Sequence, residues 1–126
     1  MNRTTNPSTW LWFWGPVAAY MGLIFYLSSQ SQLPIGPDVS DKLLHVLAYF
    51  GLAVVVVRAL CAGLPAHVGR ATAIVAWVVA AGYGVTDEIH QMFVPGRTAA
   101  VDDLVADAIG AFAGVVLCWA WGKMSA

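Results

Sequence analysis

Three short stretches of an otherwise apolar chain carry most of its chemically reactive side chains. The first surrounds His45, the second runs from Thr86 to Gln91, and the third holds Asp103 and Asp107. Carboxylates and histidines are the side chains that bind divalent metals and exchange protons near neutral pH. The chain could therefore form a metal site or an acid–base site, provided that its fold brings these stretches together.

The composition indicates that this fold is embedded in a membrane. Of the 126 residues, 60% are hydrophobic and 10% are charged, with a mean hydropathy of +0.72. Soluble domains carry about 25% charged residues, so a soluble enzyme, a disordered chain and a nucleic-acid binder are all excluded. One membrane crossing takes about 20 residues, so four crossings nearly exhaust the length. We expect residues 1–126 to form a single all-α membrane domain.

Four apolar runs define the expected membrane helices. They span about residues 10–28, 42–61, 71–94 and 99–121. Pro95 and Gly96 predict a short turn, which makes the third and fourth helices antiparallel neighbours. The fourth helix carries Gly110 and Gly114, a spacing of small residues that predicts close contact with another helix.

The basic residues predict how the helices are oriented. On the side of the two chain ends lie Arg3, Arg58, Arg70 and Lys123. The opposite side holds Lys42 and Arg97, together with all seven acidic residues. Because the more basic side faces the cytoplasm, both termini are predicted to be cytoplasmic. Five tryptophans then form an aromatic belt at the inner interface: Trp10, Trp12, Trp14, Trp119 and Trp121.

The third helix must include polar residues to cross the bilayer. Its apolar part, residues 71–85, spans about 22 Å against a hydrocarbon core of about 30 Å. The helix therefore continues through Thr86–Gln91, within the outer part of the bilayer. A charged group at a membrane-helix centre costs roughly 2.5–3.5 kcal/mol, so these side chains need partners.

Helical spacing predicts what those partners are. Asp87, His90 and Gln91 share one face of the third helix, and Asp103 and Asp107 share one face of the fourth. Counted from the turn, the two faces lie at the same depth and can meet, with Arg97 near enough to balance their carboxylates.

The second helix adds a further group at this level. Asp38 or Ser40 is the expected N-cap, and Asp41 and His45 share the next face, with Lys42 beside them. Three helices are thus predicted to form one outward-facing pocket. Its members are Asp41, Lys42, His45, Asp87, Glu88, His90, Arg97, Asp103 and Asp107.

Three interpretations of this pocket stay open. A divalent metal such as zinc, manganese or iron could bind, with the candidate ligands Asp41, His45, Asp87 and His90. Acid–base catalysis is a second possibility, with the candidate groups Asp87, Glu88, His90, Asp103 and Asp107. A third is a network of paired charges that only holds the helices together. In either functional case Lys42, Arg97 and Gln91 are candidates for binding a substrate such as an anionic lipid headgroup.

The same residues resemble the VanZ-like family of small bacterial membrane proteins. The matching segments are residues 25–30, Ser40–Leu52, Tyr83–Arg97, Asp102–Asp107 and Gly110. The resemblance implies a multi-pass protein of the bacterial cytoplasmic membrane, linked to resistance against teicoplanin-type glycopeptides. It implies no established reaction.

Together, the pocket and the resemblance suggest action on a cell-envelope or lipid-linked component at the outer leaflet. One alternative is a non-enzymatic structural or accessory membrane protein. Another is a small transporter, which would need a homo-oligomer because the charges of four helices are confined to one side. The lipid bilayer is the expected partner in every case, and nucleic acid in none.

Overall fold

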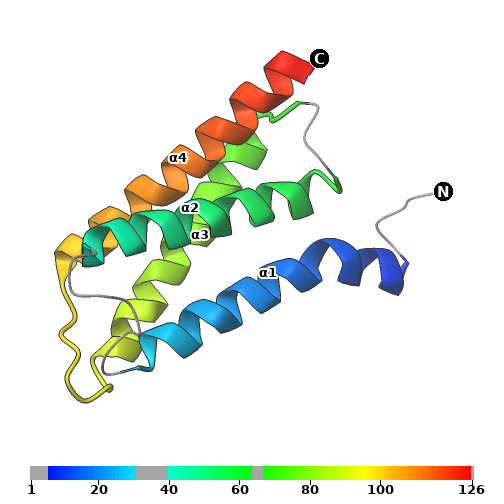
Figure 1. Ribbon diagram of the computed structural model, residues 1–126. Helices are drawn as coiled ribbons and strands as arrows, with labels where there is room; N and C mark the ends of the chain where they lie inside the picture. The colour runs from blue at the N-terminus through cyan, green and yellow to red at the C-terminus, as the bar shows by residue number, and fades with distance from the viewer. Residues whose placement is uncertain (1–5, 31–39, 64–66, 126) are drawn as a thin grey trace.

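The computed structural model describes residues 6–30, 40–63 and 67–125. Over these ranges the chain forms four α-helices and no strand. They are α1 (Pro7–Ser28), α2 (Asp41–Leu60), α3 (Arg70–Gln91) and α4 (Val101–Ser125). Each helix is long and apolar enough to cross a membrane, which confirms the all-α, four-span prediction. The start of α1 and the end of α4 lie at the same end of the bundle (Figure 1).

Local capping explains where the first two helices begin. The Asn6 side chain accepts a hydrogen bond from the Ser8 amide at 3.1 Å, and Pro7 occupies the first helical position. At α2 the N-cap is Ser40, whose hydroxyl accepts from the Leu43 amide at 3.4 Å. Ser40 was one of the two predicted caps; the other, Asp38, lies outside the described residues.

The connection between α3 and α4 is longer than predicted. α3 ends at Gln91 rather than near residue 94, and α4 begins at Val101. Within the connection, the Arg97 amide donates to the Val94 carbonyl at 3.1 Å, and Gly96 has a φ of 82°. This is a turn with Pro95 and Gly96 at its centre. Proline disfavours the helical conformation at the residue before it, here Val94, so the helix ends before the turn. The predicted Pro-Gly turn is therefore present within a longer loop.

The closest helix contact joins α2 to α4 through two glycines. A Cβ atom at Gly110 would overlap the Val46 carbonyl oxygen, and one at Gly114 would lie 2.5 Å from the Phe50 carbonyl oxygen. Only glycine lets the two backbones approach this closely. The predicted small-residue contact is confirmed, and its partner is α2.

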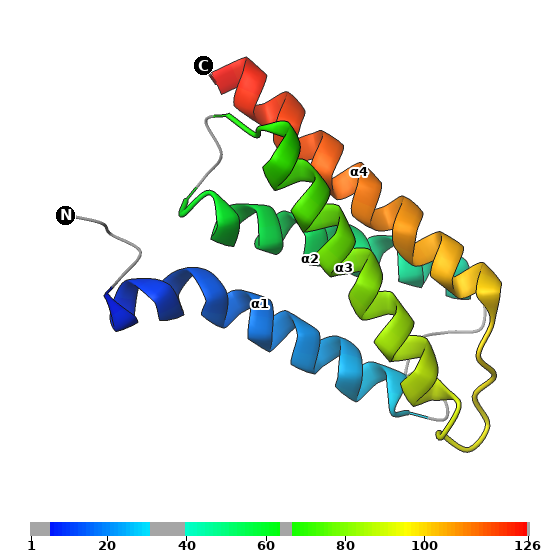
Figure 2. The ribbon, with the colours of Figure 1, turned by 180° about the vertical axis from the view of Figure 1, so that it is seen from behind.

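The other two helices are held by polar side chains that reach backbone carbonyls. Trp77 of α3 donates to the Ala108 carbonyl of α4 at 3.0 Å, and Tyr83 of α3 donates to the Met21 carbonyl of α1 at 2.7 Å. α2 and α3 thus lie between α1 and α4, as Figure 2 shows from behind. The core where they meet is apolar and includes Leu52, Ala53, Val56, Ala76, Ala80 and Ala111.

The bundle's exterior is also apolar, as a lipid environment requires. Large side chains such as Trp12, Ile74 and Phe112 are exposed on three different helices. At the end that holds the chain termini, Arg58 lies over the ring of Trp12 and Lys123 lies over the ring of Trp119. Exposed aromatic rings beside cations are typical of a membrane interface.

Candidate functional site

The acidic side chains of the described residues, together with His45 and His90, gather at the other end of the bundle. The C-terminal ends of α1 and α3 and the N-terminal ends of α2 and α4 meet there (Figure 1). The structure therefore brings together the three stretches that the sequence singled out. Five of their polar side chains are buried: Asp87, Glu88, Gln91, Asp103 and Asp107. Buried polar groups are costly unless they are paired, so their partners define the site.

His45 is the centre of a carboxylate cluster between α2 and α4. Its Nδ1 lies 2.7 Å from Oδ1 of Asp107, and its Nε2 lies 3.8 Å from Oδ2 of Asp41 and 3.9 Å from Oδ2 of Asp103. The Lys42 ammonium forms an ion pair with Asp103. The imidazole therefore faces carboxylates through both ring nitrogens. The predicted shared face of Asp41 and His45 accounts for the Asp41 contact.

Asp107 fits its position because α3 has a glycine opposite it. The residue has no exposed surface, and a Cβ atom at Gly84 would lie 2.7 Å from its Oδ2. That oxygen has no hydrogen-bond partner among the described residues. One side of the carboxylate is thus bound to His45, while the other side faces α3 unpaired.

Glu88 joins α3 to the start of α4. Its Oε2 accepts a hydrogen bond from the Ala100 amide at 2.9 Å, beside the N-terminus of α4, where the helix dipole favours negative charge. Its Oε1 is buried and has no hydrogen-bond partner among the described residues.

Two overlapping groups of side chains have metal-site spacing. In one, single ligand atoms of Asp41, His45 and Asp103 lie within 4.8 Å of one another; in the other, those of His45, Glu88 and Asp107 do. Both share His45, a predicted ligand, and the first also includes Asp41. In the part of the chain that the structure describes, neither group includes Asp87 or His90.

His90 instead faces α1. Its Nδ1 lies 3.0 Å from the Ser28 hydroxyl, and its ring stacks on Phe25 with the ring centroids 4.1 Å apart. Helical spacing predicts one shared face for His90 and Asp87. In the structure His90 contacts α1, whereas Asp87 contacts α2. The expectation that this face meets the face of Asp103 and Asp107 is therefore wrong for His90, because α1 packs against this side of α3.

Asp87 has a partner that sequence reasoning missed. The Tyr49 hydroxyl of α2 donates to Oδ2 of Asp87 at 3.2 Å, and both residues are buried. Tyr49 lies in an apolar helix, and a buried tyrosine there usually forms a hydrogen bond with a polar group. That preference was the signal that could have identified it.

Arg97 does not balance the carboxylates as predicted. Its guanidinium donates to the Leu27 carbonyl of α1 at 3.4 Å, and its Nε is buried without a partner among the described residues. It forms no ion pair with a described carboxylate. The long α3–α4 connection carries Arg97 towards α1. The Nε–H of its positively charged guanidinium is therefore left without an acceptor among the described residues.

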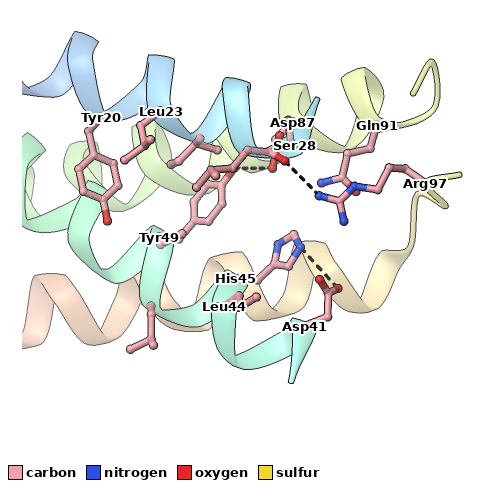
Figure 3. A pocket seen from close by; sticks show the side chains of 14 residues that line it. Tyr20, Leu23, Ser28, Asp41, Leu44, His45, Tyr49, Asp87, Gln91 and Arg97 are labelled. Atoms are coloured by element: carbon pink, nitrogen blue, oxygen red, sulfur yellow. Dashed lines mark hydrogen bonds and ion pairs between the residues drawn. The ribbon is translucent and has the colours of Figure 1, made fainter. Parts of the chain in front are cut away.

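A cavity of 310 Å³ lies between α1 and α2 beside these residues (Figure 3). Its polar end is lined by Ser28, Asp41, His45, Asp87, Gln91 and Arg97, and the rest mainly by apolar residues of α1 and α2. Leu23 and Leu47, which also line it, are 53% and 55% exposed. The cavity therefore reaches the apolar outer surface between the two helices.

Four helices that are long and apolar enough to cross a membrane, with a polar cluster at one end, define a multi-pass integral membrane protein. A family model described as VanZ/LLP1 matches residues 13–122. The chain therefore belongs to the VanZ-like family, which confirms the resemblance seen in its sequence. Comparisons with curated proteins and with solved structures found no match.

Proposed function

We propose that this protein binds an anionic lipid or a lipid-linked envelope component in the outer leaflet of the bacterial cytoplasmic membrane. The observation that carries the proposal is the α1–α2 cavity, which is apolar along the helices and ends beside the partly unpartnered guanidinium of Arg97. A lipid has the same division, with apolar chains attached to a charged headgroup.

The apolar part of the cavity suits a lipid chain that enters from the side. Leu23 and Leu47 belong both to the cavity lining and to the exposed apolar surface, so a chain can pass between α1 and α2 from the bilayer. A volume of 310 Å³ is at the lower end for small-molecule sites. A cavity of this size holds the headgroup of a lipid and the first part of its acyl chain, while the rest of the acyl chain stays in the bilayer.

Within the polar end, which also holds the carboxylates of Asp41 and Asp87, the pair Arg97 and Gln91 suits a phosphate or carboxylate group. Arg97 supplies a fork of N–H donors, the Gln91 amide lies beside it, and both line the cavity. Lys42, the other predicted substrate-binding cation, lies outside the lining and pairs with Asp103. The proposal therefore assigns headgroup binding to Arg97 and Gln91, with Lys42 balancing the acidic cluster.

The loop charges support an outward-facing cavity. Arg58, Arg70 and Lys123 lie at the opposite end from the acidic cluster, and the more basic end is expected to face the cytoplasm. Under this orientation both termini are cytoplasmic. The cavity then opens at the level where headgroups of the outer leaflet lie.

Native mass spectrometry of gently extracted protein tests the binding. We expect the wild-type chain to retain one anionic lipid, whose mass separates a phospholipid from a lipid-linked precursor. Arg97→Ala removes a charge-assisted contact and should weaken retention about tenfold to a hundredfold. Arg70→Ala, an exposed cation at the other end, is the matched control. Equal retention by all three proteins would contradict the proposal.

A second pair of variants tests the apolar part. Ala48 lines the cavity, so Ala48→Phe should exclude the chain, whereas Ala113→Phe on the exposed face of α4 should not. Size-exclusion profiles identify any variant that fails to fold. Retention of lipid by folded Ala48→Phe at the wild-type level would exclude this cavity as the chain site.

The family resemblance extends the proposal to glycopeptide susceptibility. By binding an envelope component, the protein would reduce the effect of teicoplanin-type drugs, which act outside the membrane. Expression in a susceptible bacterium should raise the inhibitory concentration of teicoplanin, and Arg97→Ala should abolish the increase at equal protein abundance. If Arg97→Ala keeps the increase, the resistance does not depend on the cavity.

An accessory role without a ligand is the second candidate, because the polar contacts also tie the helices together. His45 with Asp107 joins α2 to α4, and Tyr49 with Asp87 joins α2 to α3. In that case the chain carries no lipid, and substitutions in the cluster lower only its stability and abundance.

A further inference from the structure

The buried carboxylate cluster has more acidic groups than positive groups to balance them. Asp41, Glu88, Asp103 and Asp107 surround His45, and the one lysine at the cluster, Lys42, pairs with Asp103. Three of the four carboxylates are buried. Buried charges persist in proteins when they are paired or coordinate a metal, so this cluster needs a further cation or bound protons.

Two unused oxygens favour a cation within the cluster. Oε1 of Glu88 and Oδ2 of Asp107 are buried and have no hydrogen-bond partner among the described residues. Glu88 and Asp107, on α3 and α4, also belong to the group with His45 in which one ligand atom from each residue lies within 4.8 Å of the others. Separate helices thus supply donors to one small volume.

We propose that His45, Glu88 and Asp107 bind a divalent transition-metal ion between α2, α3 and α4. One imidazole nitrogen with carboxylate oxygens is a donor set suited to manganese, iron or zinc. Bond lengths of about 2.1 Å put neighbouring ligand atoms roughly 3 Å apart in an octahedral site. The present 2.7 Å between His45 Nδ1 and Asp107 Oδ1 needs only a small adjustment.

The neighbouring residues are arranged to support such a site. Asp41 and Asp103 face the other nitrogen of His45 at 3.8 and 3.9 Å, where a carboxylate orients a metal-bound imidazole. Gly84 leaves space beside Asp107, and the Ala100 amide holds one oxygen of Glu88. The ion site adjoins the lipid cavity but does not require a lipid.

Metal analysis of the full-length chain in detergent, without added lipid, tests this proposal separately from lipid binding. The protein carries no polyhistidine tag, is stripped with a chelator and is then exposed to Mn²⁺ or Zn²⁺, with Mg²⁺ and Ca²⁺ for comparison. After gel filtration, mass spectrometry measures the bound metal. We expect about one transition-metal ion per chain, since the three donors surround one volume.

Glu88→Gln and Asp107→Asn should each weaken metal binding by at least about tenfold, because even residues that only orient a ligand have effects of that size. Asp102→Asn and His90→Gln are matched controls at the same end of the bundle, and neither residue belongs to the group. Both controls should bind metal like the wild type.

Three results would overturn the proposal: a folded wild-type chain without metal, equal binding by all variants, or a preference for Mg²⁺ or Ca²⁺. Loss of metal in His90→Gln alone would assign the ion to another place. If Glu88→Gln and Asp107→Asn do not fold, the test is the melting temperature of the wild-type protein, measured with and without metal. Metal should raise it and a chelator should reverse the increase; an unchanged melting temperature refutes the site.

Discussion

The Asp107 carboxylate of α4 occupies the space that Gly84 leaves on α3. A Cβ atom at residue 84 would lie 2.7 Å from Oδ2 and 3.1 Å from Cβ of Asp107. Because Asp107 also lies 2.7 Å from His45, the carboxylate is enclosed by three helices. Gly84 is thus part of the carboxylate cluster around His45, although it has no side chain.

Adding one methyl group at Gly84 should disturb this arrangement. Gly84→Ala pushes against a fully buried side chain that His45 holds on its other side, so we expect a loss of about 1–3 kcal/mol in the free energy of unfolding. Thermal unfolding in detergent measures it. Gly82→Ala, where a Cβ atom meets nothing within 4 Å, should leave the melting temperature unchanged or slightly higher. Equal effects of the two substitutions would refute the steric explanation.

Removal of the Tyr49 hydroxyl should also destabilise the protein. Tyr49→Phe deprives the buried Asp87 carboxylate of its donor at 3.2 Å, which should cost about 1–3 kcal/mol. Tyr26→Phe on the exposed surface of α1 is the control and should have no effect on the melting temperature. A stable Tyr49→Phe variant would mean that Asp87 obtains its stabilisation elsewhere.

The proposed orientation predicts which ends of the helices an impermeant reagent can reach. In a chain with Cys61→Ser and Cys118→Ser, we introduce either Asp102→Cys or Met124→Cys, both at exposed positions at opposite ends of α4. A membrane-impermeant maleimide should label Asp102→Cys in intact spheroplasts, and Met124→Cys only after lysis. The reverse pattern would contradict an outward-facing cavity.

The features that the sequence predicted depend on helical period and residue size. Apolar runs define the four spans, and the spacing of Asp41 and His45 fixes their shared face. Gly110 and Gly114 predicted a close contact between helices, because a larger residue at either position would overlap the neighbouring backbone. These properties belong to single helices and needed no knowledge of their neighbours.

The remaining features depend on which helix packs on which face. His90 and Asp87 lie close together on α3, but α1 covers one of them and α2 reaches the other. The position of α1 follows from contacts such as Tyr83 with the Met21 carbonyl, which no spacing rule predicts. For the same reason Arg97 was expected among the carboxylates, while the long loop carries it to Leu27.

The glycine contact between α2 and α4 has a consequence for how this architecture can diversify. With those two backbones in contact and α3 held by Asp107 and Trp77, three of the four helices resist change at their shared surfaces. The remaining cavity wall is α1, where Leu23 faces both the cavity and the outside. Substitutions at exposed lining positions of α1, such as Leu23, alter the shape of the cavity without disturbing those contacts. Under the proposed function, substitutions along α1 would therefore change which ligand the cavity binds and leave the carboxylate cluster between α2, α3 and α4 unchanged.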